Sequence, residues 1–523
     1  MTGWSVHLPA LMLAIPLLGA FLSPVMGVLG GRLLRGAWSV LVSCVLLFLS
    51  FCLLRYVSVN GTAVYVMGGE AWNFTLPSGL VYPVRIILEV DSFNAFVAVI
   101  GCFASLAGTL FGLRFLNRFS GRNWYTALYF LLTAGMLGLV LTGDLFNFFV
   151  FLEIASVASF GLIAYWRDRS EAIEASFKYM LVSQVAAMTV LLAIGFLYGR
   201  YNLLNMAALG SVVRPGIAEK IALVFLVTAL AMKCGAFPMH MWMPDSYAEA
   251  PASVTVLLVV VSQASLVGLC RLLFSVFGTA IGTDVIPWTL ICLGVFSMFF
   301  GVSMAVVQHE VKRLMGYHSV SQVGYMLMAF GVGLLVIGDP RQTVEFGKMS
   351  IQGGIFHMVN YMMYKGLLFL TAGSLYYVTG TRDLDRMGGL VRKMPLTCGM
   401  FVLAAAAISG IPPCNGFVSK LLIYESAFTV HPLLAVVALV TSVLTLASFV
   451  KVFQAAFLGP ERPEFTEVRE VPGAMLAGMS VLVVVILGLS LFPTWVMSHL
   501  VEPAATALLD KGAYVGAVLG GGL

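Results

Sequence analysis

The chain has 523 residues, of which 60% are hydrophobic and only 10% are charged, and its mean hydropathy is +0.98. Soluble domains average roughly 25% charged residues, so this composition predicts a polytopic membrane protein. It excludes a soluble enzyme, a nucleic-acid-binding protein and a disordered scaffold. The formal net charge of +5 reflects basic loops rather than an acidic partner.

Apolar segments of about 20 residues, the length that crosses a bilayer, recur along the whole chain. The first lacks the basic leading region of a signal peptide and is predicted to be a retained helix. Residues 59–91, between the second and third segments, are predicted to form a short hairpin. We predict an all-α protein with fourteen transmembrane helices near residues 8–30, 37–58, 92–113, 124–142, 143–166, 171–199, 218–243, 251–278, 285–308, 312–338, 350–380, 395–430, 432–459 and 472–500.

These segments divide the chain into four regions. Residues 1–90 hold the first two helices and an external loop, 91–280 and 281–460 form two repeat regions, and 461–523 hold the last helix and a tail. The loops after odd-numbered helices carry most of the loop lysines and arginines, as cytoplasmic loops do. This pattern predicts a cell-membrane protein with both termini outside.

Glycine and proline interrupt the seventh and twelfth predicted helices. The interruptions are Lys233-Cys-Gly-Ala-Phe-Pro238 and Gly410-Ile-Pro-Pro-Cys-Asn-Gly416. Proline kinks occur in many membrane helices without an ion site, but interrupted helices at corresponding places in two halves are typical of ion sites between inverted repeats. Because each break has a lysine beside it, we interpret the breaks as parts of an ion pathway.

Five ionisable side chains fall within the predicted helices: Glu153, Lys178, Lys233, Lys365 and Lys420. Each costs roughly 2.5–3.5 kcal/mol at the bilayer centre, so we expect them to be functional. Glu153 is expected to be the charge partner of Lys233 or Lys178, so that a change in their separation loads or releases a proton. The helix dipole is expected to favour a cation at Lys233 and to oppose one at Lys420, near the start of a half-helix.

Histidines and hydroxyl groups lie between these charges. His357, Tyr361 and Lys365 recur every four residues and form one polar stripe, roughly 12 Å long. His318 and Gln322 lie one turn apart on the preceding helix. A buried histidine can be a packing residue, but a neutral imidazole donates and accepts on opposite nitrogens. Two histidines near lysines therefore favour a proton relay.

Several of these segments, in the same order, resemble the antiporter-like subunits of Mrp cation/proton antiporters, respiratory complex I, and membrane-bound hydrogenase or sulfane-sulfur reductase complexes. GDLFNFFVFLEIASVASFGLIAYW (143–166) looks most like the glutamate helix of the D-type Mrp protein. KCGAFPMHMWMPDSYAEAPASV (233–254) looks like the family motif K-x-x-x-x-P-x-H-x-W-L-P-D-A. VKRLMGYHSVSQVGYM, FHMVNYMMYKGLLFLTAG and SGIPPCNGFVSKLLIYESAF resemble the tenth, eleventh and twelfth helices.

The resemblance implies that Glu153 and Lys233 are the first-half pair, Lys365 the central relay and Lys420 the terminal lysine. It also implies fourteen helices in two inverted repeats. Two positions depart from the family. Where many members carry a lysine in the eighth helix, this chain has Ser262 and Gln263, which implies an altered bridge or one carried by water and Gln263. Tyr361 replaces the family's second histidine and can relay through its hydroxyl.

The leading hypothesis is a proton- or sodium-translocating subunit of a larger membrane complex of the Mrp, hydrogenase or complex I type. Its expected partners are other membrane subunits, the lipid bilayer, and H⁺ or Na⁺, with no nucleic acid. The eight cysteines are scattered singly without metal or iron–sulfur spacing. No metal, cofactor or redox centre is therefore predicted in this chain, and whether it serves an enzyme stays open. The alternatives are a stand-alone transporter of an organic solute and a quinone-reactive membrane subunit.

Overall fold

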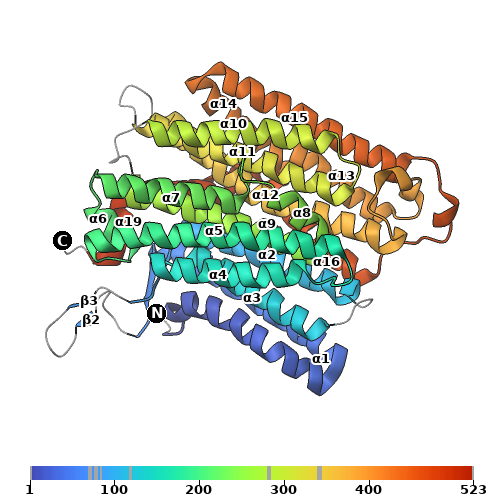
Figure 1. Cartoon of the computed structure of the whole chain (residues 1–523), viewed down its shortest axis with the longest axis horizontal. Helices are drawn as coiled ribbons and strands as arrows, with labels where there is room; N and C mark the ends of the chain where they lie inside the picture. The colour runs from blue at the N-terminus through green and yellow to red at the C-terminus, as the bar shows by residue number, and fades with distance from the viewer. Residues whose placement is uncertain are drawn as a thin grey trace.

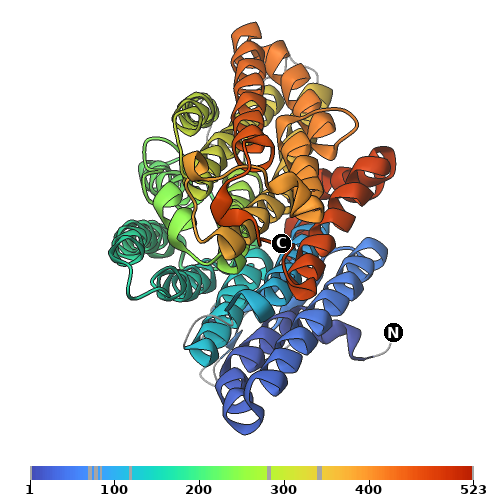
Figure 2. The ribbon, with the colours of Figure 1, turned by 90° about the vertical axis from the view of Figure 1, so that its right-hand side faces the viewer.

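The computed structural model describes residues 3–68, 74–75, 81–82, 85–116, 121–278, 284–338 and 344–520. These residues form a bundle of long helices that run side by side along the long axis of the molecule (Figure 1). Viewed along this axis, the N-terminal helices form one edge of the bundle and the orange helices around residues 415–453 form the opposite edge (Figure 2). Ten helices of the described part are long and apolar enough to cross a membrane.

The first half of the bundle consists of α1 (Leu8–Asn60), α2 (Ser92–Phe115), α3 (Arg122–Leu141), α4 (Leu145–Ile163), α5 (Ser170–Tyr201), α6 (Met206–Val212), α7 (Ile217–Cys234), α8 (Trp242–Glu249) and α9 (Ala252–Arg271). The second half consists of α10 (Val285–Val306), α11 (Val311–Gly338), α12 (Val344–Thr379), α13 (Pro395–Ser409), α14 (Asn415–Val430), α15 (Pro432–Phe453) and α16 (Gly473–Leu491). The chain continues into α17 (Pro493–Val496), α18 (Glu502–Leu509) and α19 (Lys511–Leu519).

The predicted all-α membrane fold is confirmed, whereas the number of fourteen crossings and the inverted relation of the repeats stay predictions. The first two predicted helices lie within the single element α1. Gly30 and Gly31 are non-helical inside it, and Gly31 has a φ of +60°, so the chain kinks between the two spans without a loop.

A short antiparallel hairpin lies at one end of the bundle, within the segment where the sequence predicts it. β1 (Ala63–Val66) pairs with β4 (Ile87–Val90), and β2 (Phe74–Thr75) pairs with β3 (Val81–Tyr82). The start of α1 and the helix α19 lie at the same end (Figure 1). The small apolar cluster of Ala207, Tyr514 and Val518 joins α19 to α6 there.

Small residues allow the most extensive helix contact among the described elements, between α10 and α11. A Cβ atom at Gly294 would lie 2.6 Å from the backbone nitrogen of Met328, and one at Gly301 would lie 2.6 Å from that of Ser321. Because lipid offers little hydrophobic drive for helices to associate, close backbone packing at small residues is a main source of their attraction. These glycines therefore position α11, which carries His318 and Gln322.

Two helices end at glycines in the middle of the bundle. α7 ends at Cys234 because Gly235 takes a φ of +82°, and α13 ends at Ser409 because Gly410 takes a φ of +73°. This left-handed conformation terminates helices and favours glycine. The chain resumes a helix at Trp242 and at Asn415, so both interruptions lie in the two segments that the sequence singles out.

Candidate functional site

Glu153 lies on α4 and faces α5. Its Oε2 accepts a hydrogen bond from the Gln184 side chain of α5 at 3.0 Å. Its other carboxylate oxygen, Oε1, is buried without a hydrogen-bond partner among the described residues. A buried carboxylate oxygen without a donor is costly unless water or a mobile proton reaches it.

Lys233 is the buried penultimate residue of α7. Its Nζ donates to the hydroxyls of Ser156, at 2.7 Å, and Ser183, at 3.3 Å, and lies 5.6 Å from the ring centre of Tyr179. Ser156 lies one turn after Glu153 on α4. The ammonium binds hydroxyls, and no ion pair joins it to Glu153 among the described residues. The role of Glu153 as the charge partner of Lys233 stays a prediction. Glu153 still lies within electrostatic range of Lys233.

Lys178 lies apart from this cluster. Its side chain is 44% exposed, and its Nζ forms ion pairs with Glu174 at 2.6 Å and Asp245 at 2.9 Å. Arg313 binds the other carboxylate oxygen of Asp245 at 2.9 Å. In the described part of the chain, therefore, the structure pairs Lys178 with carboxylates other than Glu153.

The two halves meet in the centre of the bundle through α9 and α12. The Gln263 side chain on α9 is fully buried, donates to the Ser262 hydroxyl at 3.2 Å, and has an unpartnered Oε1 among the described residues. Tyr361 of α12 faces the side chains of Ser262 and Ser319, but its hydroxyl is outside hydrogen-bond geometry. Gln263 thus faces the protein interior and not lipid, and polar groups from both halves converge here.

Lys365 and His318 continue this row in the second half. The Lys365 ammonium donates to the main-chain carbonyl of Met315 on α11 and lies 5.5 Å from the ring centre of Phe369. His318, one turn after Met315, is fully buried and stacks on Phe449 with a ring-centre distance of 4.8 Å. Within the described structure, neither ring nitrogen of His318 has a hydrogen-bond partner.

His357 is held by two helices at once. Its Nδ1 lies 3.1 Å from the Ser419 hydroxyl of α14, and its Nε2 lies 3.2 Å from Oε1 of Gln322 on α11. The Tyr364 hydroxyl donates to the same Gln322 oxygen at 3.2 Å. The expected stripe of His357, Tyr361 and Lys365 therefore shares one helix, but its members bond to different neighbours rather than to one another.

Lys420 lies on α14 and is buried. Its Nζ donates to the main-chain carbonyl of Ile408 at 2.9 Å and to the Ser442 hydroxyl at 2.8 Å, and it lies 4.9 Å from the Tyr325 ring centre. Ile408 is in the last turn of α13, where the helix dipole and the unpaired carbonyls favour a cation. The ammonium reaches back across the break to the preceding half-helix, whose C-terminal end favours a cation. The expectation that the dipole at the start of α14 opposes Lys420 stays a prediction, and this contact offsets it.

Sequence reasoning missed the polar residues that hold these groups. Gln184 and Ser183 contact Glu153 and Lys233, and an amide pair joins α12 to the second break: Asn415 donates to the Asn360 side chain at 2.8 Å. The available signals were weak. Ser156 follows Glu153 by three residues, on the same helix face, and Asn415 lies inside the Gly-Pro interruption.

A second buried polar cluster, also missed, lies at the hairpin end. Glu89 of β4 accepts hydrogen bonds from the Asn205 side chain at 2.6 Å and from the Tyr514 hydroxyl. Nearby, Arg271 pairs with Asp91 at 2.6 Å. Burial raises the pKa of Glu89 from its ordinary value of 4.5 to about 7, although the bonds from Tyr514 and Asn205 and the charge of Arg271 oppose this rise.

Comparisons with known proteins identify relatives across nearly the whole chain. The family described as "NADH:quinone oxidoreductase/Mrp antiporter, TM" matches residues 142–445. The chain is 32% identical to the D-type subunit of the Na(+)/H(+) antiporter of Alkalihalophilus pseudofirmus, over 91% of this chain and 92% of the relative. It is 33% identical to subunit N of the NADH-quinone oxidoreductase of Desulforudis audaxviator, over 96% of this chain and 99% of the relative.

Solved structures agree with these relatives. A chain of the Mrp complex from Dietzia sp. DQ12-45-1b has a TM-score of 0.85 and 26% identity, covering 99% of this chain and 100% of that one. A chain of the membrane-bound sulfane sulfur reductase, an archaeal respiratory membrane complex, has a TM-score of 0.86 and 26% identity, covering 98% and 100%. The family match includes Glu153, Lys233, Lys365 and Lys420. This multi-pass membrane protein therefore belongs to the NADH:quinone oxidoreductase/Mrp antiporter family.

Proposed function

We propose that this chain is an antiporter-like subunit that translocates protons, with sodium as the alternative ion, within a multisubunit membrane complex. One observation carries the proposal. A row of ionisable and polar side chains crosses the bundle from α4 to α14. Glu153 is half-buried, and the other members are buried: Lys233, Gln263, Tyr361, Lys365, His318, His357 and Lys420.

The partners of the lysines suit proton exchange. Lys233, Lys365 and Lys420 all donate to neutral hydroxyls or carbonyls. A carboxylate in direct contact would hold the proton on the lysine, whereas neutral acceptors leave it exchangeable. We infer that approach and retreat of the Glu153 charge loads and unloads Lys233.

Unpartnered polar atoms support water-assisted transfer between the charged groups. Among the described residues, buried atoms of Glu153, Gln263, Tyr361 and His318 lack hydrogen-bond partners. Buried polar atoms of this kind are ordinarily satisfied by water. We infer that the central junction at Gln263 conducts when it is hydrated.

The relatives support the assignment to a complex. Those compared above are named as subunits of an antiporter and of an oxidoreductase, and the structural neighbours belong to an Mrp complex and a respiratory membrane complex. Other membrane subunits are therefore the proposed partners. These relatives favour ion translocation over a stand-alone transporter of an organic solute or a quinone-reactive subunit. The basic loops support a cell-membrane orientation with both termini outside.

The proposal is tested by reconstituting the complex that contains this chain into proteoliposomes with a pH-sensitive dye. Glu153→Gln and Lys233→Ala should abolish proton movement while the complex still assembles. Glu502→Gln and Lys348→Ala are matched controls, because these residues form an ion pair at the surface, at 2.8 Å. Near-normal pumping by either pathway variant would refute the assignment, and a parallel sodium-sensitive dye distinguishes the two ions.

A further inference from the structure

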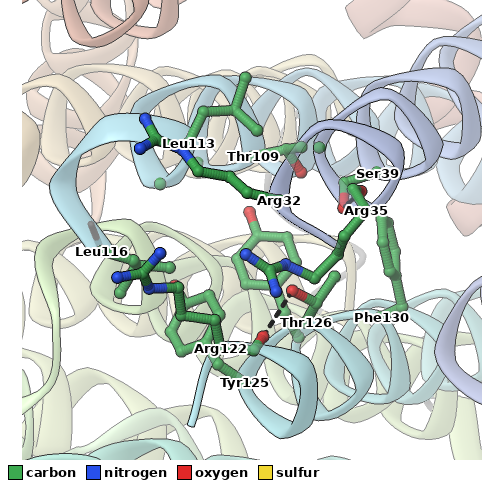
Figure 3. Close-up of a pocket in the computed structure, with 14 residues that line it drawn as sticks. Arg32, Arg35, Ser39, Thr109, Leu113, Leu116, Arg122, Tyr125, Thr126 and Phe130 are labelled. Atoms are coloured by element: carbon green, nitrogen blue, oxygen red, sulfur yellow. Dashed lines mark hydrogen bonds between the residues drawn. The ribbon is translucent and has the colours of Figure 1, made fainter. Parts of the chain in front are cut away.

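A small cavity lies between α1, α2 and α3, at the end of the bundle that carries the basic loops. Its volume is about 50 Å³, several times the roughly 10–15 Å³ that one water molecule requires. Arg32 and Arg35 of α1 and Arg122 of α3 line it (Figure 3). No aspartate or glutamate is among the described residues that line the cavity.

The three arginines create a strongly positive site. Like charges around one cavity repel one another, and the repulsion grows as the surroundings become less polar. Arg35 is half-buried and donates to the Asn123 side chain at 2.6 Å, so its position is fixed by a neutral group. The planar fork of a guanidinium group matches the oxygens of a phosphate.

The start of α3 adds to this positive potential. α3 begins at Arg122, directly at the cavity, with Gly121 as its N-cap, no side-chain capping hydrogen bond and no acidic residue in its first turn. The free N–H groups and the dipole of a helix N-terminus attract anions, phosphate in particular. Both the arginines and the helix end therefore select an anionic ligand.

The surface beside the cavity distinguishes a lipid from a free anion. The kinked part of α1 next to Arg32 exposes large apolar side chains: Val28 is 79% exposed, Leu29 74% and Leu33 86%. In a membrane protein, apolar side chains that alternate with arginines at the end of a helix occupy the boundary between acyl chains and headgroups. Basic pockets between helices on the cytoplasmic side are suited to lipid headgroups.

We propose that this cavity binds the phosphate group of an anionic phospholipid, with Arg32, Arg35 and Arg122 on the phosphate and the lipid's acyl chains against Leu29 and Leu33. The site connects α1 to α2 and α3. None of the pathway residues from Glu153 to Lys420 lines it, so the site stands independently of the proposed function.

Native mass spectrometry of the detergent-purified complex tests the proposal. The chain is released from the complex in the spectrometer, and the lipid that stays bound to it is measured. Phosphatidylglycerol, phosphatidylcholine or inorganic phosphate is added at equal concentration. The wild-type chain should retain phosphatidylglycerol in preference to phosphatidylcholine. Replacing Arg32, Arg35 and Arg122 together by Gln should reduce this retention on the order of tenfold. Replacing Arg386, Arg392 and Arg469, three arginines exposed at the same end, by Gln should leave it unchanged.

Each other outcome overturns the proposal. Equal retention of phosphatidylcholine would show that the headgroup charge is not recognised, and displacement of the lipid by inorganic phosphate would identify a free-anion site. Unchanged lipid retention with loss of a co-purifying subunit from the triple variant would identify a subunit interface. If the triple variant does not fold, Arg32→Gln alone, at an exposed position, should still weaken retention, and an unchanged value would refute the assignment.

Discussion

Substitution of Glu89 by Gln isolates the effect of one buried charge on stability. Glu89 of β4 is almost fully buried against the start of α6 and against α19. Its two carboxylate oxygens accept hydrogen bonds from Asn205 and Tyr514. A glutamine of the same shape can keep the first bond through its carbonyl. Its amide can donate to the Tyr514 oxygen after the hydroxyl rotates. The substitution therefore removes the charge with little change in packing.

The sign and size of the effect follow from the pKa of Glu89. Burial raises this pKa from 4.5 to about 7, and each pKa unit corresponds to about 1.4 kcal/mol, so the rise corresponds to about 3 kcal/mol. Below pH 4.5 the carboxyl group is protonated in both the folded and unfolded states, and stability is unaffected. As the pH rises from about 4.5 to about 7, the unfolded state ionises before the folded state does, and the folded protein loses this 3 kcal/mol; above about pH 7 the loss is complete.

The assay is thermal unfolding of the purified protein in detergent between about pH 5 and pH 8.5. The Tm of the wild type relative to that of Glu89→Gln should fall by a few degrees between about pH 5 and pH 7.5 and then level off. Glu502→Gln is the matched control, since Glu502 is half-exposed and pairs with Lys348 at the surface. Parallel Tm curves for the wild type and Glu89→Gln would refute the reasoning.

Further predictions concern the pathway and its packing. In the proteoliposome assay, Lys365→Ala and Lys420→Arg should both stop proton movement, because an arginine cannot release its proton; an active Lys420→Arg variant would indicate a fixed charge instead. Gln263→Leu should slow transport strongly without lowering the Tm, whereas Gln263→Lys should be tolerated. Full activity of Gln263→Leu would indicate that His318, and not Gln263, carries the proton between the two halves. Gly416→Ala should destabilise the protein by about 1–3 kcal/mol, because its Cβ would overlap the Ala407 carbonyl; an equal Tm for Gly416→Ala and for Gly399→Ala, where space is open, would contradict this.

The sequence alone determined the class of the protein, the positions of most of its helices and the main candidates for the pathway. Helix length follows from the bilayer's thickness, and a glycine can end a helix wherever it lies, so Gly235 and Gly410 were readable without a structure. Glu153, Lys233, Lys365 and Lys420 stand out because a charge inside an apolar segment is costly. These are properties of short segments, which need no knowledge of neighbouring helices.

Only the tertiary structure decided which groups each charge meets. Lys178 and Lys365 look alike in the sequence, yet Lys178 is 44% exposed and bound to carboxylates, whereas Lys365 is buried against a carbonyl. Lys420 follows the second break, yet its ammonium binds the helix before it. The hydropathy of the sequence indicates how far along a helix a charged residue lies. Which hydroxyl or carbonyl group the charge contacts depends on the rotation of each helix about its axis and on where it crosses its neighbours. The rotation and the crossing point depend on packing between residues far apart in the chain, such as Ser442 and Lys420.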